Sequence, residues 1–229
     1  MKYIWFVLVL IYNSTFSQEI KVAGSMRTIM QEGDLKAYVD LDTISKRNLY
    51  AIGPVENLKG EILVLDGKIY STSLEDKKLH NRINKISKAS MLVYIRVEKW
   101  KSVTRQANVN SYAALEKLIM ATADEYGIND PDPFVFKIES TTAKVSFHVI
   151  DWKPEAVHTQ ENHKQFAYQG TMKDEKLTLL GFYSDYHHGI FTHHSSNMHV
   201  HVLSEVSKIV GHLDDINLHG NITIYLPKQ

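Results

Sequence analysis

Hydrophobic and polar residues alternate along much of this chain, above all in its second half. A period of two places successive side chains on opposite faces of a β-strand. The alternating or β-branched runs are separated by short polar turns such as Lys173-Asp174 and His219-Gly220. The pattern predicts strands over 61–65, 68–72, 91–100, 134–139, 143–150, 165–171, 177–183, 189–193, 198–203, 212–218 and 221–226.

One segment has helical spacing instead. Between residues 111 and 126, Ala114, Leu118 and Ala121 fall on one face of a helix, and Gly127 is placed to end it. Asp66-Gly67 predicts a tight hairpin, and Pro131 and Pro133 predict a stiff connector. These elements indicate a strand-rich α+β protein with helix concentrated in the first half.

The first seventeen residues form a separate pattern. Lys2 is followed by an apolar run of about ten residues, too short for a bilayer core of roughly 30 Å, and then by small residues up to Ser17. This pattern is typical of a secretory signal peptide over 1–17, with one domain over 18–229. A buried first strand or helix is the alternative. We therefore expect a periplasmic or secreted protein, with no membrane contact after cleavage.

Composition narrows the classes of partner. The 229 residues are 44% hydrophobic and 23% charged, with 26 basic and 26 acidic side chains. This neutrality argues against nucleic acid or an anionic membrane as the main partner, because both select a basic face. There are no cysteines, so the ligands of any metal must be His, Asp or Glu.

Histidines are concentrated in the second half, where eleven of the twelve lie between His148 and His219. His199 and His201 are two apart in an apolar run, so both leave one strand face roughly 6.5–7 Å apart. His212 follows after a stretch long enough for the chain to reverse. Three imidazoles with an open fourth position are typical of a catalytic zinc. The alternative is a pair of histidines on an exposed strand face.

Several segments, in order, resemble the alpha-acetolactate decarboxylase family. The resemblance extends from about Met26 to Pro227. It is found in 33–35, 49–53, the Gly-Glu segment 60–70, 181–182, 189–190, the His-x-His run with His212, and 222–227.

The resemblance implies a fold of two packed mixed or antiparallel β-sheet layers with a few helices, with a metal site in the C-terminal half. It implies Zn²⁺ held by His199, His201 and His212, and Glu61 as the acid/base residue. The expected reaction is zinc-dependent decarboxylation of 2-acetolactate, a small keto acid, to acetoin and CO₂. Members are often dimers, so a homodimer is a further expectation.

Two departures from the family pattern stand out. The family has an arginine on the strand where this chain has His148, and no arginine follows Arg105. Arginine is always charged and can donate two parallel hydrogen bonds to a carboxylate. Histidine is charged only when protonated and does not form this bidentate contact. His148 is thus either a substituted catalytic donor or an ordinary strand residue. The family also has a second glutamate beyond its last strand, and this sequence ends at Gln229 without one.

These departures keep an alternative open: an exported zinc-binding relative with lost or altered activity, either a binding protein or a lyase on another substrate. A zinc carrier using the histidines of 187–194 is a third, weaker possibility. Those histidines are either donors that orient ligands or solvated turn residues. Glu205 and Asp214 can each accept a ligand N–H or be strand-end charges, and Tyr183 is expected to pack rather than react.

Overall fold

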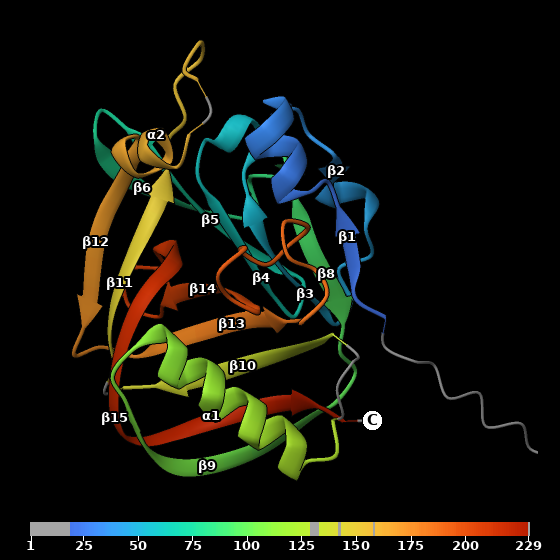
Figure 1. The fold of residues 1–229 in the computed structure, drawn as a ribbon, viewed down its shortest axis with the longest axis vertical. Helices are drawn as coiled ribbons and strands as arrows, with labels where there is room; N and C mark the ends of the chain where they lie inside the picture. Colours follow the sequence, from blue (N-terminus) through green and yellow to red (C-terminus); the bar gives the residue numbers. More distant parts are fainter. Residues whose placement is uncertain (1–18, 129–132, 142, 158, 229) are drawn as a thin grey trace, which may run out of the picture.

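The computed structural model describes residues 19–128, 133–141, 143–157 and 159–228 (Figure 1). The predicted signal segment 1–17 and Pro131 lie outside these described residues. Among them, no helix combines the length and the apolar character needed to cross a membrane.

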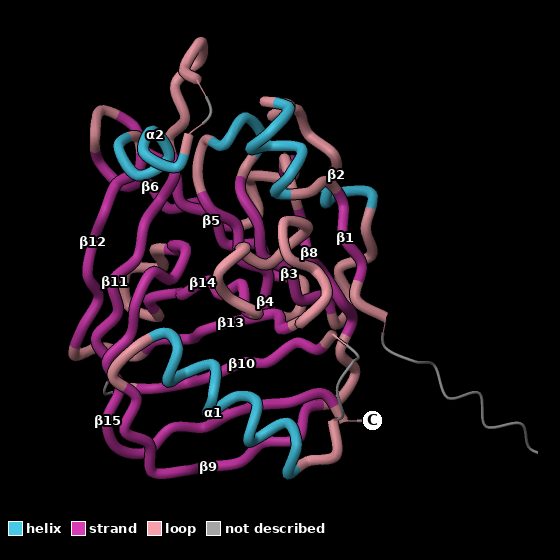
Figure 2. Tube along the Cα trace, in the orientation of Figure 1, coloured by secondary structure: helices cyan, strands magenta, loops and turns pink. Residues whose placement is uncertain are grey.

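Two antiparallel sheets form the protein (Figures 1 and 2). The first contains, in spatial order, β1 (Lys21–Ala23), β8 (Leu92–Arg96), β3 (Leu49–Pro54), β4 (Glu61–Leu65), β5 (Lys68–Glu75) and β6 (Lys78–Ile83). The second contains β10 (Phe134–Ser140), β13 (Leu177–Tyr183), β14 (Met198–Ser204), β15 (Val210–Pro227), β11 (Ala143–Ile150) and β12 (Ala167–Lys173), with β9 (Trp100–Val109) paired to β15. A small ribbon joins β2 (Val39–Asp40) to β7 (Lys88–Ala89). The predicted fold class, a strand-rich α+β protein of packed sheets, is confirmed.

Strand β15 gives the second sheet its curl. Its first residues pair with β14 and β11, and its last residues pair with β9 and β10. Because β10 also pairs with β13, the sheet turns back on itself through this one long strand. Helix α1 (Tyr112–Glu125) lies across it and buries Leu115 and Ile119 in its core, while α2 (Gln160–Gln165) precedes β12.

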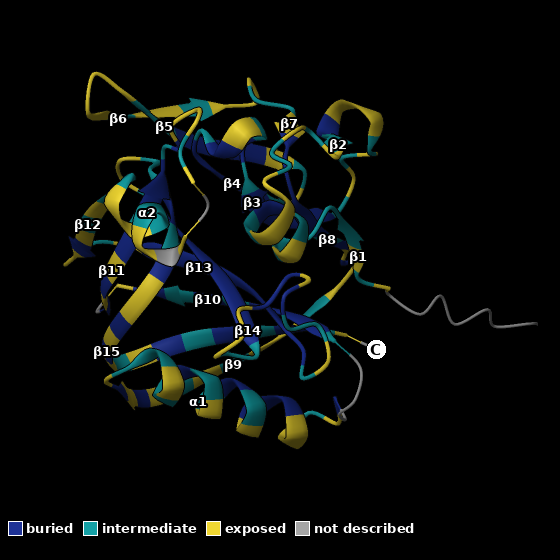
Figure 3. Ribbon diagram, turned by 45° about the horizontal axis from the view of Figure 1, so that its top comes forward, coloured by how far each residue is buried: buried dark blue, intermediate teal, exposed yellow. Residues whose placement is uncertain are grey.

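The two sheets share a hydrophobic core. Ile52 and Leu63 of the first sheet pack with Val135, Leu180 and Phe182 of the second. β13 and β14 have their residues buried throughout, in the centre of the molecule (Figure 3). Burial on both faces explains why β13 is mostly apolar, whereas β14 carries two buried histidines, His199 and His201. Polar groups that lie between the sheets are therefore removed from water.

Several predicted elements coincide with the structure. β4 covers 61–65, β11 covers 143–150 and β13 covers 177–183, as the alternation predicts. The predicted helix is α1, and the Ser111 side chain caps it by accepting a hydrogen bond from Ala114 N.

Three predictions of elements are wrong. Residues 189–193 form a tight turn and not a strand, because the amides of Ile190 and Thr192 donate to His187 O within the loop. His219-Gly220 does not separate two strands, because both residues pair with β9 and continue β15. The strand expected over 91–100 ends at Arg96, and a second strand, β9, begins at Trp100.

Candidate functional site

The three histidines of the sequence motif meet on the second sheet. His199 and His201 lie on β14 and leave it on the same face, and His201 is directly opposite His212 on β15. The ring centres are 5.0 Å apart for 199 and 201, 5.0 Å for 199 and 212, and 5.5 Å for 201 and 212. Strand register therefore brings together residues that the sequence separates by a turn.

The tautomer of His201 follows from its partner. Its Nδ1 is 2.8 Å from the carbonyl oxygen of Ile62 on β4, and a carbonyl only accepts, so Nδ1 carries the proton. Its Nε2 then has a lone pair, and it lies 3.1 Å from Nε2 of His199. His199 and His201 are 2% and 0% exposed.

The ring-centre separations are close to those of imidazoles around a zinc ion, although the donor nitrogens of these three residues do not all lie within 4.8 Å of one another in the described part of the chain. With Zn–N bonds of 2.0–2.1 Å and tetrahedral angles, ligating nitrogens lie roughly 3.3 Å apart and ring centres roughly 5 Å apart. Burial lowers the pKa values of His199, His201 and His212, so the imidazoles are neutral, the form that binds metal. The Nδ1 atoms of His199 and His212 are buried without a hydrogen bond of ordinary geometry in the described part of the chain.

Glu61 enters from the other sheet. It begins β4, which lies against β14 and β15, and it is 3% exposed. One carboxylate oxygen accepts a hydrogen bond of 3.3 Å from Ile150 N, and the other lies 3.6 Å from Nε2 of His201. Burial raises the pKa of Glu61 to about 8. A carboxyl that retains its proton near neutral pH is a suitable proton donor.

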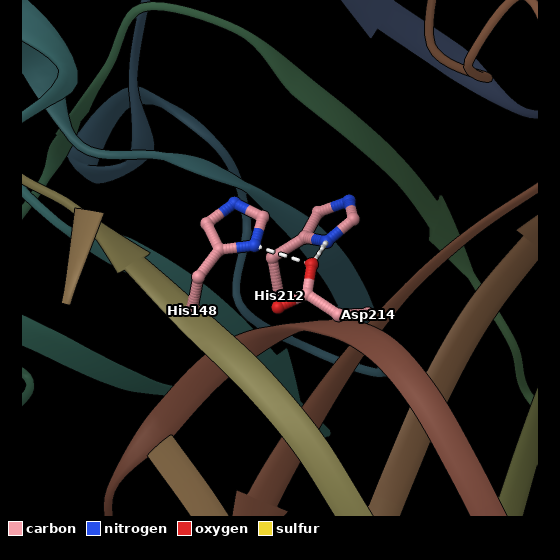
Figure 4. A group of neighbouring side chains, drawn as sticks. All are labelled: His148, His212 and Asp214. Atoms are coloured by element: carbon pink, nitrogen blue, oxygen red, sulfur yellow. Dashed lines mark hydrogen bonds and ion pairs between the residues drawn. The ribbon is translucent and has the colours of Figure 1, made fainter. Parts of the chain in front are cut away.

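His148 lies on β11 beside His212, with the two rings stacked at 4.6 Å. Its Nδ1 donates to Asp214 Oδ1 at 2.6 Å, and His212 Nδ1 is 3.9 Å from the same oxygen. Figure 4 shows the carboxylate below both rings, with both Nε2 atoms pointing away from it to the same side. Burial acts to lower the pKa of His148, but Asp214 and Glu61 outweigh it and raise the pKa.

All five predicted site residues are thus gathered where the two sheets meet. The donor atoms that lie within 4.8 Å of one another, however, are those of His148, His212 and Asp214. From the sequence, Asp214 is either an acceptor for the N–H of a ligand or a charge at the end of a strand. Its spacing of two from His212 on one strand, which places both on the same face, was the available signal.

The remaining candidates lie elsewhere or have other partners. Glu205 accepts from Thr178 and pairs with Lys208, and Tyr183 stacks on Phe134 at 5.0 Å, as packing predicts. His187 is held by Ser184 and stacks on Phe191. The other histidines of the 187–194 loop form no compact metal-ligating group among the described residues.

The fold and site define an α+β protein of two antiparallel sheets with a buried imidazole and carboxylate cluster between them. Comparison with known families then identifies a match to the alpha-acetolactate decarboxylase model over residues 22–228. The chain belongs to this family, which confirms the resemblance of its sequence segments.

Solved structures share the fold. Acetolactate decarboxylase from Bacillus subtilis subspecies spizizenii matches with a TM-score of 0.73 at 17% identity, over 91% of this chain and 86% of that one. The alpha-acetolactate decarboxylase of Bacillus subtilis strain 168 gives 0.72 at 18% identity, with the same two coverages. A Staphylococcus aureus protein of unknown function, similar to alpha-acetolactate decarboxylase, gives 0.72 at 17% identity over 92% and 86%. A search of curated proteins found no match.

Proposed function

We propose that this protein is a carboxy-lyase that converts 2-acetolactate to acetoin and CO₂ with a bound zinc ion. The observation that supports it best is the buried Glu61 carboxyl beside His201, in a chain that belongs to the alpha-acetolactate decarboxylase family. The substrate class is a small 2-hydroxy-3-keto acid.

His199, His201 and His212 are the residues that would hold the metal. When bound there, zinc supplies a Lewis acid for the hydroxyl and keto oxygens of the substrate and offsets the negative charge that develops as CO₂ leaves. The Ile62 carbonyl fixes the tautomer of His201, so this ligand needs no reorientation.

Glu61 supplies the proton that completes the reaction. The bond between the substrate carboxylate and its neighbouring carbon breaks, and its electron pair moves toward the keto oxygen. The carbon that lost CO₂ then takes a proton from the Glu61 carboxyl, and Glu61 is reprotonated from water. The hydrogen bond from Ile150 N holds the carboxyl in one orientation, which favours protonation of one substrate face.

His148 occupies the place that the family resemblance gives to an arginine. As a cation beside Asp214, it would donate to the substrate carboxylate with weaker orientation than a guanidinium. If histidine in place of arginine at position 148 abolishes the reaction, the protein is instead a zinc-binding member of the family with altered activity.

The test is an acetoin assay on the purified chain, with zinc per chain measured on the same sample. We expect acetoin well above the uncatalysed rate. Glu61→Gln should retain zinc and lose about 10²- to 10⁴-fold in kcat, because the proton donor is gone.

Glu75→Gln is the matched control, since Glu75 pairs with Arg82 at the far end of β5 and should leave turnover unchanged. Full zinc occupancy with no acetoin above background would rule out the proposed reaction. Normal turnover in Glu61→Gln would remove Glu61 from it.

We make two further proposals, which concern export and assembly. We propose cleavage after Ser17, so the exported chain would begin at Gln18, which mass spectrometry of the mature protein can read directly. We also propose a homodimer, which sedimentation can test.

A further inference from the structure

A pocket of about 340 Å³ lies over two of the proposed zinc ligands, His199 and His212. Its other walls come from distant parts of the chain. Helix α1 contributes Tyr112 and Glu116, and the loop before β14 contributes Ser196. Tyr112 donates to Met198 O at 3.1 Å, which fixes this face of α1 against the strand that carries His199.

Glu116 contributes a carboxylate to this wall. Ser196 Oγ donates to Glu116 Oε2 at 3.1 Å. Within the described ranges, no lysine or arginine forms an ion pair with it. Glu125, further along the same helix, is instead paired with Arg105. The negative charge of Glu116 is therefore left facing the pocket, whereas that of Glu125 is compensated.

The rest of the lining adds a second negative charge and no permanent positive one. This second carboxylate is that of Asp214, which accepts a hydrogen bond from His148 Nδ1 at 2.6 Å. The lining contains no lysine or arginine, and its basic side chains are the imidazoles of His193, His199 and His212.

With zinc bound at the three histidines, an anionic substrate in this pocket would gain attraction at the end held there. A carboxylate at its other end would meet Glu116 in a place partly shielded from water. Like charges brought together in this way oppose binding strongly.

We infer that Glu116 is a specificity-determining residue that limits the site to small hydroxy acids with one carboxylate and excludes dicarboxylates. The inference rests on the proposed function, because it takes the hydroxy acid to bind beside the three histidines.

The test compares two ligands of equal size and different charge. Malate and its 4-monoamide share the 2-hydroxy acid group, but only malate carries a second carboxylate. Titration calorimetry on the zinc-loaded full chain should give a Kd for malate at least about tenfold higher than that for the monoamide. Added salt should narrow this gap, since it screens the repulsion.

Glu116→Gln should reduce the gap to about threefold or less. Glu125→Gln, on the same helix, should leave the gap unchanged. Equal binding of both ligands to the parent protein would overturn the inference. An unchanged gap in a Glu116→Gln variant of normal thermal stability would also overturn it, as would no binding of the monoamide.

Binding is measured here without turnover, so the two proposals fail separately. A protein that makes no acetoin but prefers the monoamide in a Glu116-dependent way retains the specificity assignment and loses the proposed reaction. A protein that makes acetoin and binds both ligands equally loses the assignment alone.

Discussion

A histidine's partner at Nδ1 determines what its Nε2 can do. The Ile62 carbonyl fixes the His201 tautomer, and the Asp214 carboxylate does the same for His148 while lying near His212. One carboxylate therefore orients the His148 ring and lies 3.9 Å from Nδ1 of His212, a proposed zinc ligand. Such outer partners set both ring orientation and ligand basicity.

Asp214→Asn is a direct test of this orienting role. We expect zinc affinity to fall about 10- to 100-fold, because the negative charge beside His212 and the hydrogen bond to its neighbour His148 are lost. Competition with a chromophoric chelator measures this change.

Asp215→Asn provides the comparison. Asp215 is adjacent but accepts from Tyr112 N at the start of α1. It should therefore affect stability more than zinc affinity. Equal zinc affinities for the parent protein and Asp214→Asn would contradict the role given to Asp214.

Contacts within the first sheet and across to the second sheet place Glu61 at the start of β4. The preceding Gly60 has φ of +140°, and a Cβ there would lie 2.1 Å from the Thr72 carbonyl oxygen. The backbone therefore requires glycine at position 60. Any side chain there would force the chain just before Glu61 to shift away from Thr72.

Gly60→Ala should destabilise the fold by about 2–3 kcal/mol, because backbone strain and overpacking add. Gly127→Ala shares a positive φ but meets nothing within 4 Å, so about 1 kcal/mol is expected there. Urea unfolding measures both. A Gly60→Ala variant as stable as Gly127→Ala would show that the close approach is relieved without cost.

A cross-sheet tie holds the same region. Lys59 Nζ donates to Asp151 Oδ1 at 2.9 Å and to Trp152 O at 2.6 Å, beside the Ile150 amide that bonds Glu61. Burial acts to raise the pKa of Asp151, but hydrogen bonds from Lys153 and Lys59 outweigh it and lower the pKa below 3.8.

Lys59→Met should therefore cost about 1 kcal/mol at pH 7, a modest value because Lys59 is 42% exposed and solvent screens the pair. Since the folded pKa of Asp151 is lowered, its contribution is complete above pH 3.8 and is lost as pH falls through the lowered value. The difference in the free energy of unfolding between the parent protein and Lys59→Met should therefore narrow as the pH falls below 3.8. A difference that widens in acid would contradict this sign.

At the scale of the whole molecule, the site joins two sheets that separate on unfolding. A ligand bound only by the folded form stabilises it by mass action. Zinc at about 1,000 times its Kd should add about 4 kcal/mol, which raises the Tm by about 8–16 °C for a chain of this size.

Calorimetry with zinc, and again after chelation, tests this expectation. His212→Ala should show no rise, and His80→Ala on the exposed β6 should behave as the parent. An equal rise in His212→Ala would place the bound zinc elsewhere.

The sequence by itself determined most local features. Periodicity located β4, β11, β13 and α1, because each is decided by its own residues and its terminal signals. The order of the family segments identified the family. The His-x-His spacing placed two imidazoles on one face, since that follows from strand geometry alone.

Only the tertiary structure decided what depends on pairing. β15 runs through His219-Gly220 because β9 supplies its partners there, and residues 189–193 turn because their amides bond within the loop. The link between His148 and Asp214 depends on register across β11 and β15, and the placing of Glu116 over the histidines depends on how α1 packs. Local pattern holds no information on either contact, because the residues involved are brought together by chain segments far apart in sequence.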